Sequence, residues 1–233
     1  MSYVIQSNKN PRLDCLKIVV GLIAFCLLAS VAVTYLGSTS KRGNITIGIS
    51  NCRQIITAMR IYSSDHGGKY PDAALASPRS SNEAFRVLFQ TMAIDNELLF
   101  GCPMSPYVPD GDIGKAPDFK QALEAGENHW ALTKGLSDSD LGSIPLMFEN
   151  PSVATWPPKW NLDAKGTKTP GRSWSNGIII GMNDSSVGIQ MLGSKTGTEV
   201  PLKDLVNGDG ENLFTQHGTD WTILNVESTP GAK

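Results

Sequence analysis

The sequence predicts an α+β protein: an N-terminal transmembrane helix, then a domain in which a helix packs on a small antiparallel sheet. Three observations predict this fold class. Residues 18–36 are uncharged and mostly apolar. Residues 50–62 place apolar side chains at helical spacing. The C-terminal half holds short apolar runs separated by turn residues. Helices that come before strands along the chain are typical of α+β domains.

The apolar run predicts the division of the chain into regions. It is long enough to cross a bilayer, which requires roughly 20 helical residues, and Lys17 at its edge can extend its ammonium to the interface. We expect an N-terminal cytoplasmic tail at 1–15, a transmembrane helix at 16–36, a polar linker at 37–49 and an exported domain at 50–233. The predicted partner of the helix is the lipid bilayer.

A cleaved secretory signal is the alternative interpretation of the same run, because Ser30-Val31-Ala32 offers a small-x-small site within it.

The composition indicates which partners and what kind of core to expect in the exported domain. The chain of 233 residues has a net charge of −2, so no basic field predicts a nucleic-acid partner. Only 18% of residues are charged, and there are 23 glycines and 14 prolines, which predicts a loop-rich domain with a modest core.

The exported domain is predicted to begin with helices. Ser50 is a candidate N-cap, and residues 65–71 contain the glycines and proline that end the first helix. A second helix is expected at 82–92 and a short one at 117–123. The apolar face of the first helix comprises Ile55, Ile56, Met59 and Tyr62.

Strands are predicted in the second half of the domain. Short apolar runs indicate strands at 130–132, 146–148 and 221–224. The clearest β unit is a hairpin, in which 176–182 and 187–192 surround a polar turn.

A long loop at 151–175 carries three tryptophans, Trp156, Trp160 and Trp174. We expect them to form the small core of the loop; an exposed stacking surface for glycans or peptides is the alternative.

A spaced motif identifies a family resemblance. Its residues are Asn51, Arg53, Gln54, Ile55, Ala58, Met59 and Tyr62, followed by Tyr70-Pro71. Cys102-Pro103 and the segment Asp184-Ser185-Ser186-Val187 stand farther along. This arrangement resembles the bacterial superfamily of type IV pilins and type II secretion pseudopilins, in which a membrane helix runs into such a motif. The resemblance implies that the exported domain is pilin-like.

The resemblance also implies a function. We expect a membrane-anchored structural protein without enzymatic activity, a subunit of a type II secretion pseudopilus or of a related pilus filament. Its partners would be copies of itself, other pilin-like subunits and the secretion machinery. Its location would be the bacterial inner membrane, crossed once, with the C-terminal domain periplasmic or otherwise extracytoplasmic.

The chain departs from the family at the processing site. The family has Gly followed by Phe-Thr-Leu-Ile-Glu, whereas this chain has Pro11-Arg12-Leu13-Asp14-Cys15-Leu16. The departure favours a second interpretation, a membrane-tethered periplasmic binding or scaffold protein that does not polymerise.

Catalytic motifs are not found in the sequence. It lacks Gly-x-Ser-x-Gly, a P-loop and Gly-x-Gly-x-x-Gly. His66, His129 and His217 lie far apart without the spacing of metal ligands, so we expect each to be a loop or surface residue. The sequence therefore predicts no enzyme, no catalytic residues and no resident cofactor.

Two further hypotheses concern the exported domain. Cys52 and Cys102 are its cysteines, and an oxidising compartment would allow a disulfide between them. Residues 207–211, Asn-Gly-Asp-Gly-Glu, place oxygen ligands at alternate positions, loosely as calcium loops do. An ordinary acidic turn is the alternative to a calcium site there.

Overall fold

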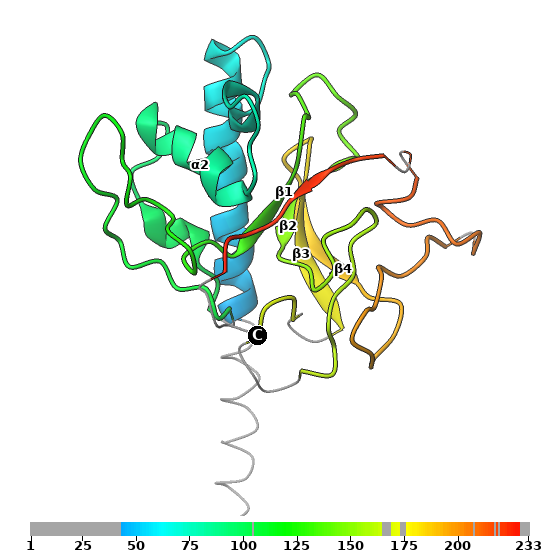
Figure 1. Ribbon diagram of the computed structural model, residues 1–233. Helices are drawn as coiled ribbons and strands as arrows, with labels where there is room; N and C mark the ends of the chain where they lie inside the picture. Colours follow the sequence, from blue (N-terminus) through cyan, green and yellow to red (C-terminus); the bar gives the residue numbers. More distant parts are fainter. Residues whose placement is uncertain are drawn as a thin grey trace, which may run out of the picture. The chain divides into compact units, whose positions relative to one another are not determined.

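Five short strands form one antiparallel sheet in the order β4-β3-β2-β1-β5 (Figure 1). The strands are β1 Trp130–Thr133, β2 Pro145–Glu149, β3 Gly177–Met182, β4 Val187–Met191 and β5 Ile223–Leu224. The structure, a computed structural model, describes residues 43–103, 105–164, 169–172, 176–206, 208–216, 218 and 220–228. Strands β1 to β4 follow one another as an antiparallel meander, and the C-terminal β5 adds to the outer edge of β1.

A helix at residues 43–65 packs on this sheet. The contact is closest at Gly181 of β3, where an added Cβ would come within 2.1 Å of Ile56 Cδ1 and 2.9 Å of Cys52 Sγ. The helix ends where Gly67 takes a φ of 64° and the Gly68 N–H donates to the Ser63 carbonyl over 2.9 Å, a glycine-dependent C-terminal stop. The absence of a side chain at Gly181 thus sets the distance between helix and sheet.

A group of shorter helices completes this side of the domain. They are η1 Pro71–Ala74, α2 Ser81–Gln90 and η2 Glu97–Phe100. Helix α2 begins at Ser80, whose Oγ accepts from the Glu83 N–H over 3.1 Å. Such an N-cap satisfies one of the donors that the first turn leaves unpaired. The phenylalanines of α2, Phe85 and Phe89, pack against Phe100 of η2.

Strands β1, β2 and β3 are buried on both faces, and alternation along them assigns side chains to one face or the other. Trp130, Leu132, Met147 and Ile179 join the core shared with the helices. The residues between them, Ala131, Phe148, Ile178 and Ile180, join a second core with Trp160 and Phe214. Burial on both sides explains why the strands read as nearly continuous apolar runs.

The structure contradicts the predicted fold class, an α+β chain with an N-terminal transmembrane helix ahead of a pilin-like domain. The described residues form the five-stranded antiparallel sheet with its helices, and none of these helices has the length and apolar character that a bilayer requires. The 43–65 helix carries Arg53, Gln54 and Arg60 among its apolar residues. The range for which the membrane helix was predicted, 16–36, lies outside the described residues.

Two element boundaries also need correction. The predicted linker at 37–49 is helical from residue 43 onwards, because Ile45 and Ile49 already pack against the core. The short helix predicted at 117–123 is a series of turns in which Phe119 and Leu123 take positive φ angles of 45° and 55°. The expected second helix is α2, and the expected hairpin is β3–β4.

Candidate functional site: a buried Cys-His-Glu cluster

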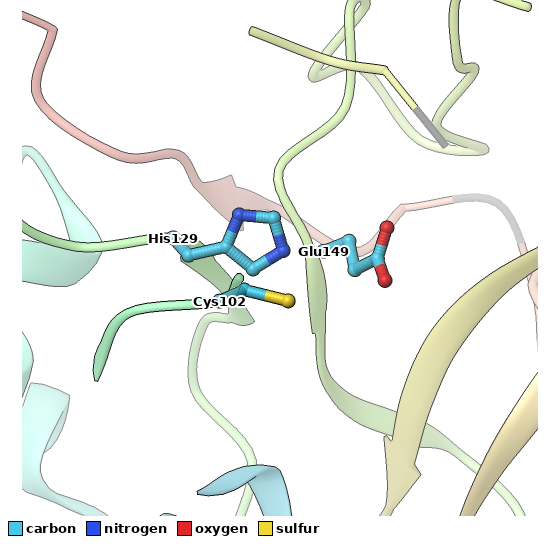
Figure 2. A group of neighbouring side chains, drawn as sticks. All are labelled: Cys102, His129 and Glu149. Atoms are coloured by element: carbon cyan, nitrogen blue, oxygen red, sulfur yellow. The ribbon is translucent and has the colours of Figure 1, made fainter. Parts of the chain in front are cut away.

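Three chemically reactive side chains meet inside the domain, and we call them the Cys-His-Glu cluster: Cys102, His129 and Glu149. One donor atom from each, Sγ, an imidazole nitrogen and a carboxylate oxygen, lies within 4.8 Å of the other two. Figure 2 shows the Cys102 thiol and the His129 imidazole extending toward the side chain of Glu149. All three residues are buried, with exposed fractions of 7%, 3% and 1%.

The sheet register brings two members of the cluster together. His129 directly precedes β1 and Glu149 ends β2, and the antiparallel pairing sets Trp130 opposite Glu149. The pairing extends by one more hydrogen bond, from the Asn150 N–H to the His129 carbonyl over 3.1 Å. A residue before one strand and a residue at the end of its antiparallel neighbour are therefore neighbours in space.

Backbone and side-chain hydrogen bonds bring the cysteine to the same place. The His129 N–H donates to the Phe100 carbonyl at the end of η2 over 2.9 Å, two residues before Cys102. From the other side, Asn51 Nδ2 on the 43–65 helix donates to the Gly101 carbonyl over 3.1 Å. The segment that carries Cys102 is thus held between the helix and the start of β1.

The imidazole of His129 is oriented by hydrogen bonds to Nδ1. Ser105 Oγ lies 2.8 Å from this nitrogen and Asn150 Nδ2 lies 3.0 Å from it. The Asn150 amide is itself fixed, because its Oδ1 accepts from the Gly171 N–H over 2.6 Å and its Nδ2 donates to the His129 carbonyl over 3.0 Å. An amide nitrogen faces Nδ1, so Nδ1 acts as an acceptor and the ring proton resides on Nε2.

The other ring nitrogen has no partner. Within the part of the chain that the structure describes, His129 Nε2 makes no hydrogen bond although it is buried. Burial lowers the pKa of His129 to about 3, so the imidazole is neutral at physiological pH. An unsatisfied buried donor costs about 1–3 kcal/mol, so a ligand that paired with this nitrogen would remove that cost.

Glu149 is embedded in the sheet. Glu149 Oε1 accepts from the Ile179 N–H of β3 over 3.2 Å, and the Glu149 carbonyl accepts from Trp160 Nε1 over 3.1 Å. Burial and then the Glu149 charge raise the pKa of the Cys52 thiol, so Cys52 stays protonated and non-nucleophilic.

A surface cavity reaches the cluster at Cys102. It has a volume of about 250 Å³ and is lined by Leu98, Gly101, Cys102, Pro103, Ser105, Tyr107, Val108 and Pro109. Cys102 is otherwise almost wholly buried, so this cavity is where water or an ion could approach the residue. A set of one sulfur, one nitrogen and one oxygen donor suits metal coordination in chemical type.

The residues of the predicted family motif lie in the core, make local hydrogen bonds or are exposed, and none belongs to the Cys-His-Glu cluster. Ile55, Ala58, Met59 and Tyr62 are buried in the core, and Arg53 is exposed. Gln54 bonds to Ser50 one turn earlier, and Asn51 holds the Cys102 segment. Pro71 begins η1.

The motif residue Tyr70 anchors a buried network. Its hydroxyl donates to Asn183 Oδ1 over 2.8 Å at the turn between β3 and β4. Arg60 Nη1 donates to the Asn183 carbonyl over 2.7 Å. The network ties the 43–65 helix and the start of η1 to the hairpin.

The disulfide predicted between Cys52 and Cys102 is not formed in the structure, which holds both residues as buried thiols. The two sulfurs have different surroundings, because Cys52 packs on Gly181 of β3 whereas Cys102 joins His129 and Glu149.

The three histidines named in the sequence analysis also have different outcomes. His129 lies in a loop directly before β1, which agrees with the prediction of a loop or surface residue, but it is buried rather than exposed. His66 stacks on Tyr62 with ring centroids 3.7 Å apart, and His217 lies outside the described residues.

The candidate calcium segment offers no assembled site within the described residues. Residue 207 lies outside them, and Gly208, Asp209, Gly210 and Glu211 are exposed. A different acidic group, Glu97, Asp110 and Glu127, brings its carboxylates within 4.8 Å of one another. Glu97 in this group already accepts from the backbone N–H groups of Gly111 and Leu123, so a structural role explains it.

Two of the three tryptophans in the long loop pack in or against the second core of the sheet, rather than forming a core of the loop alone. Trp160 is fully buried. Trp156 packs edge-on against Phe214, with ring centroids 4.9 Å apart, and its Nε1 donates to the Phe214 carbonyl over 2.9 Å. Trp174 lies outside the described residues.

The cluster escaped prediction because its members come from three separate elements. One signal was available: a polar residue precedes the predicted strand 130–132, and another follows the predicted strand 146–148. If those strands are taken as antiparallel neighbours, His129 and Glu149 fall side by side. Comparison of the chain with family models, with curated proteins and with solved structures finds no match in any of the three.

Proposed function

We propose that the chain is a non-enzymatic structural subunit of the pilin and pseudopilin kind, which packs through the outward face of its 43–65 helix against helices of neighbouring subunits. Its proposed place is the extracytoplasmic side of the bacterial inner membrane. The proposed partners are further copies of the chain, related subunits and the secretion machinery to which they belong.

The observation that carries this proposal is a pair of exposed isoleucines on one side of the 43–65 helix. Ile47 and Ile61 are 49% and 55% exposed. They are fourteen residues apart (61 − 47), close to four helical turns of 3.6 residues, so they share one face. Large exposed apolar side chains aligned on one face favour a contact with another protein.

A groove on the same side of the 43–65 helix adds support. Its volume is about 380 Å³ and it is lined by Ser50, Arg53, Gln54, Thr57, Ala58, Ile61, Ala93, Ile94, Asp95 and Leu99. The small side chains of Ala58 and Ala93 on its walls allow close approach of a second helix. Because the opposite face of the helix is buried on the sheet, the helix offers this one surface for assembly.

A second candidate function is the non-polymerising binding or scaffold protein. A groove of about 1340 Å³ runs beside the edge strand β4 and favours it. Ile189 and Met191 of β4 are 39% and 51% exposed, and the 193–206 segment forms the opposite wall. An edge strand with exposed apolar side chains can pair with an extended segment of a partner.

Photo-crosslinking separates the two functions. A photoreactive amino acid replaces Ile47 or Ile61 in the full-length chain in its native cells, and Met191 on β4 carries it in the matched variant. A structural subunit should give covalent ladders of this chain or of chains of similar size from positions 47 and 61. Crosslinks from Met191 alone, to a partner of different size, would establish the binding protein and overturn the first proposal.

A further inference from the structure

We propose that the Cys-His-Glu cluster is a zinc site, with Cys102 Sγ, His129 Nε2 and a Glu149 carboxylate oxygen as the protein ligands. Thiolate, imidazole and carboxylate are the three ligand types that Zn²⁺ takes in proteins. The mixed set discriminates against Mg²⁺ and Ca²⁺, which require oxygen ligands throughout. This inference goes beyond the proposed function and does not depend on it.

The spacing of the donor atoms fits a single ion. With bonds of about 2.3 Å to sulfur and about 2.0–2.1 Å to nitrogen or oxygen at tetrahedral angles, ligand atoms stand about 3.3–3.6 Å apart. The three donor atoms lie within 4.8 Å of one another. Closing on an ion therefore requires each pair to approach by no more than about 1.5 Å, which side-chain rotation can supply.

The unpartnered nitrogen of His129 points to a ligand independently of the spacing. Nε2 is buried and makes no hydrogen bond within the described part of the chain. A ring nitrogen of histidine is the commonest protein ligand of metals. A bound ion would give this nitrogen the partner that the described residues do not supply.

The surroundings of His129 are also those of a metal ligand. On coordination the ring proton moves from Nε2 to Nδ1, and Nδ1–H donates a hydrogen bond to Ser105 Oγ, which lies 2.8 Å away and can accept through its lone pairs. Asn150 Nδ2, which donates to Nδ1 in the absence of an ion, then keeps only its hydrogen bond to the His129 carbonyl. The proton of the Cys102 thiol leaves to solvent. Metal-bound histidines commonly hold their second nitrogen in such a bond, which fixes the ring.

Access and the fourth ligand come from the cavity beside Cys102. Three protein ligands leave one position of a tetrahedral ion for water, and the cavity of about 250 Å³ borders the thiol. The ion would join the segment after η2 to β1 and β2, three parts of the chain that are far apart in sequence. By linking these three parts of the chain, the ion would reinforce the core under the 43–65 helix.

The test uses the full-length chain, purified under reducing conditions without chelator. Elemental analysis should find about one zinc per chain. X-ray absorption of that zinc should show one sulfur at about 2.3 Å with the remaining nitrogen and oxygen ligands at about 2.0–2.1 Å. Loading with Co²⁺ in place of zinc should give a thiolate-to-cobalt charge-transfer band in the near-ultraviolet.

Matched cysteine variants assign the site. Cys102→Ser should abolish the charge-transfer band, whereas Cys52→Ser should retain it. Absence of zinc from the wild-type chain together with absence of the band after Co²⁺ addition would overturn the proposal, as would a band lost with Cys52→Ser and kept with Cys102→Ser. The wild-type absorption measurement decides the matter even where a variant fails to fold.

Discussion

Replacement of Gly181 by alanine probes the contact that defines the fold. Gly181 lies on β3 directly beneath the 43–65 helix, and a Cβ at this position would stand 2.1 Å from Ile56 Cδ1 and 2.9 Å from Cys52 Sγ. Real Cβ atoms do not approach other heavy atoms so closely, so the Ile56 side chain or the helix must shift. Ile56 and Cys52 are fully buried, which leaves little room for either movement.

The expected size of the destabilisation is set by two opposing effects. Overpacking a buried site costs about 1–3 kcal/mol. Alanine is favoured over glycine inside a strand by about 0.5–1 kcal/mol because it loses less backbone entropy on folding. Overpacking outweighs the entropy gain, so Gly181→Ala should lower the free energy of unfolding by about 1–2 kcal/mol. Urea unfolding followed by circular dichroism measures the change.

Two further variants show whether the clash is the cause. Gly188 on β4 has open space around it, with no heavy atom within 4 Å of an added Cβ, so Gly188→Ala should be neutral or slightly stabilising. Ile56→Val removes the Cδ1 atom, and the double variant with Gly181→Ala should therefore lose less stability than the sum of the single variants. A harmless Gly181→Ala, or additive effects in the pair, would refute the proposed packing of helix on sheet.

Three other predictions follow from individual side chains. Tyr70→Phe leaves Asn183 Oδ1 buried without its 2.8 Å donor and should cost about 1–3 kcal/mol in urea unfolding, whereas Tyr62→Phe, in which the ring still packs on His66, should cost less; equal losses would contradict the network. Burial, and then the Glu97 charge, raise the pKa of Glu127 from 4.5 to about 7, so the folded chain binds this proton more tightly than the unfolded chain and stability falls as pH rises from about 4.5 to 7. Glu127→Gln should accordingly raise the melting temperature more at pH 8 than at pH 5, and an equal rise at both would refute this coupling. Ser105→Ala removes the acceptor proposed for Nδ1–H and should weaken zinc binding about 10–100-fold in a chelator competition, with unchanged affinity as the contrary result.

The elements that the sequence predicted well are those whose signal is local. The β3–β4 hairpin follows from two apolar runs around a polar turn, and α2 follows from apolar residues at helical spacing. The predicted N-cap Ser50 was wrong, because the helix that contains it begins at residue 43. The predicted helix at 117–123 failed because the positive φ angles of Phe119 and Leu123 depend on the surrounding structure and leave no mark in the periodicity. The transmembrane helix rested on composition alone, and no described helix shares that composition.

The candidate site could not be predicted in the same way, because it depends on sheet register. Strand pairing is a long-range property, and neither His129 nor Glu149 carries information about its partner in its own neighbourhood. The spacing rule for metal ligands rejected His129 because that rule describes ligands on one helix or loop. Ligands that come from the segment after η2, the residue before β1 and the end of β2 obey no sequence spacing, so a search by spacing alone does not find such sites.

For the two cysteines, the segments that carry them do lie in contact, but the predicted disulfide is not formed. The predicted disulfide required the helix that carries Cys52 to meet the segment around Cys102. The hydrogen bond from Asn51 to the Gly101 carbonyl places these segments in contact. The thiols next to these two residues nevertheless have different partners. Cys52 lies over Gly181, where its size limits the approach of helix and sheet, and Cys102 faces His129 and Glu149. Oxidation of Cys102 would remove the thiolate ligand of the proposed zinc site, so oxidation of this thiol and zinc binding exclude each other.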